Sequence, residues 1–136
     1  MPIDNTTPVP LPVTAEDAVG ALRGLGIGDG DVVLAHSALR AFGSVEGGAA
    51  TIATALVEAV GSDGTVVAPA FTFRHEASFH PVIDPAGDPS EMGAISEAVR
   101  RMPGALRSTA YRHSFAAVGR HATTVTDTDP GLAVFD

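Results

Sequence analysis

The sequence predicts an α/β protein in which helices cover both faces of a mainly parallel sheet. Two short apolar runs, residues 32–35 and 65–68, contain β-branched residues and do not alternate cleanly with polar ones, which is typical of strands buried on both faces. An apolar-periodic stretch, residues 49–60, separates them and favours a helix that crosses between parallel strands. We therefore predict a three-layer α/β/α architecture.

The N-terminal part of the chain is predicted to be an arm followed by a helix. Residues 1–13 are rich in Pro and Thr and are expected to form a flexible arm outside a domain of residues 14–136. Thr14 is a typical helix N-cap, and Asp17 stands three residues later in the capping-box position. Apolar residues then recur at helical spacing until Gly26, a natural helix stop.

The central helix and the strand after it have clear ends. Ile52, Leu56 and Val60 share one face of the predicted helix, and Gly61 ends it. Pro69 closes the second strand. Residues 70–91 contain three prolines and no sustained period, which predicts a long irregular loop of a kind that tends to be functional or mobile.

Two further elements are expected before the C-terminus. A third helix is predicted from about residue 91 or 93 to residue 102, where Pro103 and Gly104 stop it. Residues 115–118 form another apolar run and are predicted to be a strand. Residues 123–136 mix Thr, Asp, Gly and Pro, so no closing element is expected there.

Composition and charge narrow the function. The absence of cysteine excludes disulfides and thiolate catalysis, and no apolar stretch approaches the roughly 20 residues of a membrane span. The N-terminus lacks the pattern of a signal peptide, so a cytoplasmic protein with no membrane contact is expected. A net charge of −8 argues against nucleic acid as a partner and suits a cationic small molecule.

The segment that follows the first predicted strand is a candidate anion site. His36, Ser37 and Arg40 are followed by a glycine-rich turn, residues 43–48, and then by a helix. Free backbone N–H groups and the helix dipole converge at such a point. The turn has neither the Walker A pattern nor the dinucleotide glycine spacing, so an ordinary strand-to-helix turn is the alternative. A serine hydrolase is disfavoured because the Gly-x-Ser-x-Gly elbow is missing.

Two other groups of polar residues invite a functional interpretation. Hydrogen-bond donors gather at Arg107, Ser108, Arg112, His113 and Ser114, where they would either grip a phosphate or form a surface arginine cluster. The long loop carries a second group, His75, Glu76, His80 and Asp84. This spacing does not match a helical zinc motif, so we expect no metal; Glu76 and Asp84 either contact a substrate or face solvent.

These segments, in their order along the chain, resemble the antibiotic N-acetyltransferase family, typified by aminoglycoside 3-N-acetyltransferases. The resemblance spans roughly residues 14–130. Its pieces are residues 36–43, 47–48, 59–61, 64–73, 92–97, 103–108 and 113–119. The combination is far more specific than any one piece.

The resemblance implies transfer of acetyl from acetyl-CoA to an amine of an aminoglycoside or a similar compound, and hence antibiotic resistance. In the family, a Ser-Leu-Arg segment after a strand and an Arg-Ser…His-Ser segment line the coenzyme A site. By position, the coenzyme residues are expected to be Ser37, Leu39, Arg40, Arg107, Ser108 and Ser114. The chain departs from the family where Ala110 and Tyr111 replace the usual His-Pro.

Family members continue well beyond 136 residues, and their catalytic His and Glu belong to the C-terminal half. An attacking amine must lose a proton, so a positioned base matters. No such role is assigned to His36, His75, His80, His113 or His121. The resemblance therefore implies the N-terminal part of a larger fold, with slow transfer or none by this chain alone.

The alternative is a catalytically inactive fragment that binds coenzyme A or a partner chain. A half-fold is expected to expose a sheet edge and apolar surface, which favours self-association or pairing with a C-terminal half.

Overall fold

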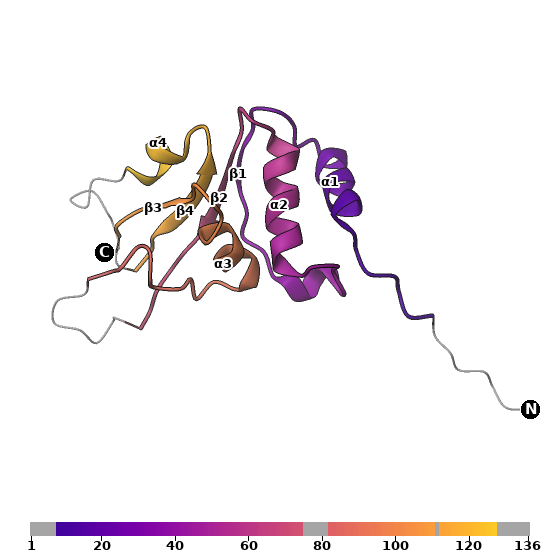
Figure 1. The fold of residues 1–136 in the computed structure, drawn as a ribbon, viewed down its shortest axis with the longest axis horizontal. Helices are drawn as coiled ribbons and strands as arrows, with labels where there is room; N and C mark the ends of the chain where they lie inside the picture. The colour runs from indigo at the N-terminus through magenta and orange to yellow at the C-terminus, as the bar shows by residue number, and fades with distance from the viewer. Residues whose placement is uncertain (1–7, 75–81, 111, 128–136) are drawn as a thin grey trace, which may run out of the picture.

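The computed structural model describes residues 8–74, 82–110 and 112–127 (Figure 1). These residues form one four-stranded sheet with the strand order β1-β2-β4-β3. The elements in chain order are α1 (Ala15–Gly24), β1 (Val32–Leu34), the 3-10 helix η1 (Leu39–Phe42), α2 (Ala49–Val60), β2 (Thr65–Pro69), α3 (Ala94–Arg100), β3 (Leu106–Arg107), β4 (Phe115–Gly119) and α4 (Ala122–Thr126).

The sheet is mixed: β1, β2 and β3 run in the same direction, as expected for a mainly parallel sheet, and β4 opposes them. Strands β1 and β2 are parallel as predicted, but β4 is antiparallel to both β2 and β3. The physical reason is the short connection of residues 108–114 between β3 and β4. A connection this short reverses the chain, so β4 runs back between β2 and β3 and opposes both. The two-residue strand β3 carries no apolar pattern and was not expected.

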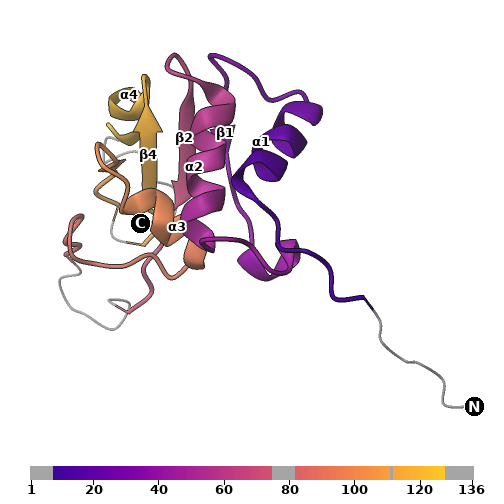
Figure 2. The ribbon, with the colours of Figure 1, turned by 45° about the vertical axis from the view of Figure 1, so that its right-hand side comes forward.

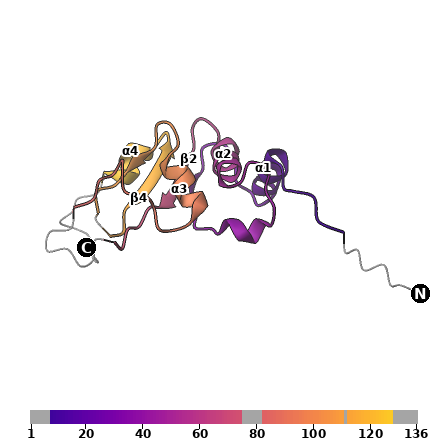
Figure 3. The same cartoon turned by 60° about the horizontal axis from the view of Figure 1, so that its bottom comes forward.

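The predicted three layers are present (Figures 1 and 3). Val66 and Ala68 of β2 belong to the main apolar core with residues of α1, α2 and α3. Val67, which points to the other face of the sheet, packs with Ala117 and with Ala122 of α4. All five residues of β2 are buried, because helices cover both sides of this strand. Helix α1 lies against α2 on the side away from the sheet (Figure 2).

The helix ends follow the local chemistry that the sequence predicts. The Thr14 hydroxyl accepts a hydrogen bond from the Asp17 N–H at 3.2 Å, and the Thr14 N–H donates to the Asp17 carboxylate at 3.0 Å. This capping box fixes the start of α1. Helix α2 spans residues 49–60, as predicted, and ends at Gly61, whose φ of +69° suits glycine.

The remaining segments differ in part from the expectations. Helix α4 lies in the tail that was expected to have no closing element. Residues 70–74 and 82–91 contain neither helix nor strand, as predicted for the long loop. Val13, the last residue of the predicted arm, pairs with Val45 in an isolated parallel bridge. Within the described residues, no helix has the length and apolar character needed to cross a membrane.

Candidate functional site

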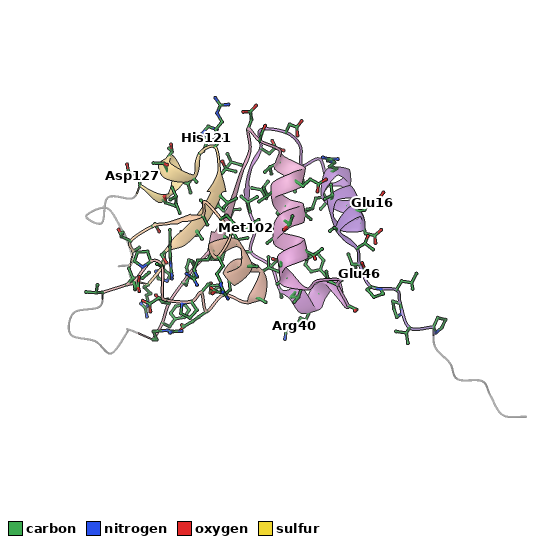
Figure 4. All side chains as sticks on the ribbon, viewed as in Figure 1. Glu16, Arg40, Glu46, Met102, His121 and Asp127 are labelled. Carbon is green, nitrogen blue, oxygen red and sulfur yellow. The ribbon has the colours of Figure 1, made fainter. Side chains whose placement is uncertain are left out.

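Four chain segments meet at one end of the sheet, here called the carboxyl end. Strands β1, β2 and β3 finish there, and β4 begins there, because β4 opposes its neighbours. The bond from the Ala70 N–H to the Ser114 carbonyl (2.8 Å) joins two of these segments. Ligands in α/β proteins commonly bind beyond the carboxyl ends of parallel strands. Figure 4 shows Arg40 at this end and His121 at the opposite end of the sheet.

Three of the predicted coenzyme residues follow β1. Ser37 is half-buried, and its carbonyl faces the backbone of Gly93, where a side chain would come within 3.9 Å of that oxygen. Leu39 packs on the main core, while Arg40 is exposed and points away from the body (Figure 4). Helix η1 places these residues between β1 and the glycine-rich turn, an intervening element that the sequence pattern did not indicate.

The glycine-rich turn is closed by its own contacts. Gly47 and Gly48 have φ values of +73° and +66°, which favour glycine. The Thr51 hydroxyl donates to the Glu46 carbonyl at 2.5 Å. Within the described residues, no side chain caps the N-terminus of α2. The anion site predicted at this turn stays a prediction.

The other three predicted residues lie together where β3 ends and β4 begins: Arg107, Ser108 and Ser114. Arg107 is half-buried, and its guanidinium donates to the Ser114 hydroxyl at 3.0 Å, to the Ala70 carbonyl at 2.5 Å and to the Asp88 carbonyl. The surface-cluster interpretation is therefore wrong for Arg107. Burial lowers the pKa of Arg107, and the charge of Arg100 lowers it further.

Both serines are fully buried and hydrogen-bonded. Ser114 is 0% exposed and donates to the Ala70 carbonyl at 2.9 Å. The Ser108 hydroxyl accepts from the Phe115 N–H at 2.9 Å, and the Ser108 N–H donates back to the Phe115 carbonyl. Each serine thus fixes the backbone at the start of β4. Contact of these residues with a coenzyme stays a prediction.

Hydrogen bonds and an ion pair join the two ends of the long loop. The residues that form them were not predicted from the sequence. Glu91 accepts from the Phe73 N–H at 2.6 Å and pairs with Arg74 at 3.2 Å. The Phe73 hydrogen bond is the main reason why the pKa of Glu91 is lowered. The Ser90 hydroxyl donates to the Pro69 carbonyl at 3.1 Å. No local spacing marks these pairs, since their partners are up to 21 residues apart.

Residues 84–88 form a compact turn, here called the acidic turn. The Asp84 N–H donates to the Asp88 carboxylate at 2.9 Å, and the Asp88 N–H returns a bond to the Asp84 carbonyl. Asp84 is exposed, and its carboxylate accepts from the Ala86 N–H at 3.1 Å. Arg100 donates to the Ala86 carbonyl at 2.8 Å. The other acidic candidate, Glu76, lies outside the described residues with His75 and His80.

A cavity of about 520 Å³ lies beside this turn. Its lining residues come from the acidic turn, the end of α3 and β3: Pro85, Ala86, Arg100, Arg101, Ala105, Leu106 and Arg107. Arg100 is paired with Glu97 through two bonds of 2.8 and 2.7 Å. In the part of the chain that is described, no group of three His, Asp or Glu residues is arranged to hold a metal ion.

Two aromatic residues directly follow residues that Arg107 binds: Phe71 follows Ala70, and Phe115 follows Ser114. Phe71 makes edge-to-face contacts with His113, at a centroid distance of 4.9 Å, and with Phe115, at 5.3 Å. The other two described histidines, His36 and His121, are exposed. None of the five histidines is assigned as a catalytic base.

The chain matches known proteins over most of its length. A family model described as aminoglycoside 3-N-acetyltransferase matches residues 34–132. Aminoglycoside N(3)-acetyltransferase VII of Streptomyces paromomycinus is 37% identical over 136 residues, which cover 88% of this chain and 47% of the relative. Enzyme VIII of Streptomyces fradiae is 36% identical, covering 88% of this chain and 48% of the relative. The chain thus spans about half the length of these curated relatives.

Solved structures of similar proteins also superpose on most of this chain over about half of their own length. YokD protein from Bacillus subtilis superposes with a TM-score of 0.82 at 28% identity, over 90% of this chain and 53% of that one. A binary structure of AAC-IIIb with CoASH gives 0.79 at 30% identity, over 87% and 50%. Sisomicin-bound AAC-VIa gives 0.78 at 31% identity, over 88% and 51%.

Proposed function

Because the chain belongs to the aminoglycoside 3-N-acetyltransferase family, we propose that it forms the coenzyme-binding part of an acetyl-CoA-dependent N-acetyltransferase. The acceptor is an amine of an aminoglycoside or a similar compound, and the biological outcome is antibiotic resistance. The reaction is assigned to the cytoplasm. The CoASH complex of AAC-IIIb supports acetyl-CoA as the donor.

One observation carries the proposal: the predicted coenzyme residues lie at the same end of the sheet, the carboxyl end, although they come from two distant parts of the chain. Ser37, Leu39 and Arg40 follow β1, whereas Arg107, Ser108 and Ser114 surround the β3–β4 connection. An extended coenzyme lying across this end would span both groups. Arg40 is exposed and available for a phosphate, which arginine binds through two parallel hydrogen bonds.

The chemistry needs more than a donor site. The amine nitrogen attacks the thioester carbonyl carbon, the C–N bond forms, the C–S bond breaks, and the coenzyme leaves as its thiolate. The amine gives up a proton in this step, so a base must stand close to it. We assign no base to the described histidines, and we propose that this chain alone transfers acetyl slowly or not at all.

The acceptor side is assigned to the acidic turn. Asp84 is exposed, and the chain carries a net charge of −8, which attracts polycationic amines at moderate ionic strength. Glu76 is proposed as a second acidic contact. The sisomicin complex of AAC-VIa supports an aminoglycoside ligand.

A second candidate function is an inactive fragment that binds coenzyme A or a partner chain. Within the described sheet, β1 pairs with β2 alone, which leaves its other edge open. Val32 and Leu34 on this strand are 56% and 62% exposed. An open edge with exposed apolar side chains favours strand addition, from a second copy or from a C-terminal half of the family fold.

Three measurements test the proposal and its alternative. Calorimetry with coenzyme A is expected to give saturable heat, which Arg40→Ala weakens and the exposed control Arg23→Ala leaves unchanged. No heat at millimolar coenzyme would remove the donor site. Release of free thiol from acetyl-CoA with a panel of aminoglycosides is expected to be slow or absent. Robust turnover would overturn the missing-base argument, and light scattering separates a monomer from the self-associating alternative.

A further inference from the structure

The guanidinium of Arg107 connects three separate pieces of the site. Its Nη2 donates to the Ala70 carbonyl, where the long loop leaves β2. Its Nη1 donates to the Asp88 carbonyl, at the end of the acidic turn, 19 residues away in sequence. Its Nε donates to the Ser114 hydroxyl, at the start of β4. All three nitrogen atoms are therefore used in holding chain segments together.

These bonds depend on the shape of the side chain more than on its charge. The three acceptors are two backbone carbonyls and a hydroxyl, all uncharged. A planar guanidinium presents its N–H groups in fixed directions, so one arginine can bind three acceptors around its rim. A lysine ammonium carries the same charge at a single point and cannot reproduce this fork.

The acidic turn is held at two places by arginines from different elements. Arg100 of α3 binds the Ala86 carbonyl and is itself fixed by Glu97. Arg107 of β3 binds the other end of the turn at Asp88. Asp84 is thus presented from a turn that is tied to α3 and to the sheet.

We propose that Arg107 is a positioning residue that fixes the acceptor side of the site to its donor side. It holds the acidic turn and the first residue of the long loop against Ser114, one of the coenzyme residues proposed above. The inference rests on the proposed function in one respect, the assignment of the acidic turn to the acceptor. Its structural part, the fastening of the loop, is independent of any ligand.

Amide hydrogen exchange tests the structural part on the whole chain without ligand. Arg107→Lys keeps the charge and removes the fork, and Arg107→Ala removes both. Each variant is expected to speed exchange at the Asp88 and Glu91 N–H groups by about tenfold or more, since hydrogen bonds to charged groups are lost. Exchange at Leu56 in α2 is expected to stay unchanged, as is exchange throughout the control Arg101→Lys, an exposed neighbour.

Wild-type exchange at Asp88 and Glu91 in Arg107→Lys would overturn the inference. An equal acceleration at Leu56 would also overturn it, because the effect would then be global destabilisation. The lysine variant keeps the test decisive if the alanine variant does not fold.

Ligand titrations test the functional part. Arg107→Lys is expected to weaken binding of sisomicin several-fold, whereas the exposed control Arg101→Lys is expected to leave it within about twofold of wild type. Unchanged sisomicin affinity in Arg107→Lys, with or without a loss of coenzyme affinity, would overturn the positioning role. If the wild-type chain binds neither coenzyme A nor sisomicin, the proposed function is wrong, and so is the functional part of the inference. The hydrogen-exchange result still tests whether Arg107 holds the loop in place.

Discussion

Different interactions stabilise the two halves of the chain. In the first half, residues 13–69, α2 packs an apolar face on β2, α1 packs on α2, and the core consists of side chains such as Leu56 and Val66. In the second half, Arg107 and Arg100 donate hydrogen bonds to distant carbonyls, and the Glu91 carboxylate accepts one from a distant N–H group; these bonds organise the described parts of the loop. The comparison shows that apolar packing builds the scaffold, while a polar network shapes the end of the sheet where the proposed site lies.

The largest expected effect is in the apolar half. Leu56 is 5% exposed in the main core, so Leu56→Ala should lower the free energy of unfolding by about 3 kcal/mol. The matched control Glu58→Ala, on the exposed side of α2, should change it by less than about 0.5 kcal/mol. Urea titrations measure both. A loss below about 1 kcal/mol in Leu56→Ala would contradict the view that apolar burial dominates here.

The second-largest loss of stability is expected at the contact between the two halves, where β2 pairs with β4. Gly119 has a φ of +122°, and a side chain there would come within 2.2 Å of the Gly64 carbonyl oxygen. Gly119→Ala should therefore cost about 2 kcal/mol or more. Gly20→Ala, at a helical position with open space around it, should be neutral or stabilising. Equal melting temperatures for Gly119→Ala and wild type would show that this close approach is not required.

A smaller effect is expected in the polar half. Ser114→Ala removes an acceptor of Arg107 and a donor to the Ala70 carbonyl, so it should cost about 1–3 kcal/mol. Ser62→Ala, at an exposed turn, serves as the control. If Ser114→Ala unfolds at the same urea concentration as wild type, the buried network does not stabilise this half.

The smallest effect is electrostatic. The pKa of Glu97 is lowered from 4.5, first by its hydrogen bonds with Arg100 and against the effect of burial. A lowered folded-state pKa means that Glu97 adds stability above pH 4.5, which is lost as the pH falls through the folded value. The stability difference between wild type and Glu97→Gln should therefore be constant at neutral pH and shrink below pH 4.5. A difference that grows on acidification would reverse this assignment.

The same division explains what could be predicted from the sequence. The bounds of α2 and the capping box of Thr14 and Asp17 depend on local periodicity and spacing, and both were predicted correctly. Strand β3 has two residues, too few for a pattern, and the antiparallel course of β4 depends on a short connection.

The candidate site, too, could be predicted from the sequence only in part. The resemblance to the family predicts which residues line it, but not how they are held. Arg107 binds backbone carbonyls at Ala70 and Asp88, which are 37 and 19 residues away. Every residue has a backbone carbonyl, so the sequence does not indicate which carbonyl accepts a hydrogen bond from Arg107. These partners can be identified only from the fold.

The central claim is that both groups of residues at the carboxyl end of the sheet bind one coenzyme. Backbone amide chemical shifts recorded during a coenzyme A titration test it most directly. The account predicts saturable shifts at Ser37 and Ser114 together, with little change at Gly64 and Arg120 at the opposite end of the sheet. Shifts confined to that opposite end, or none at millimolar coenzyme, would contradict the account.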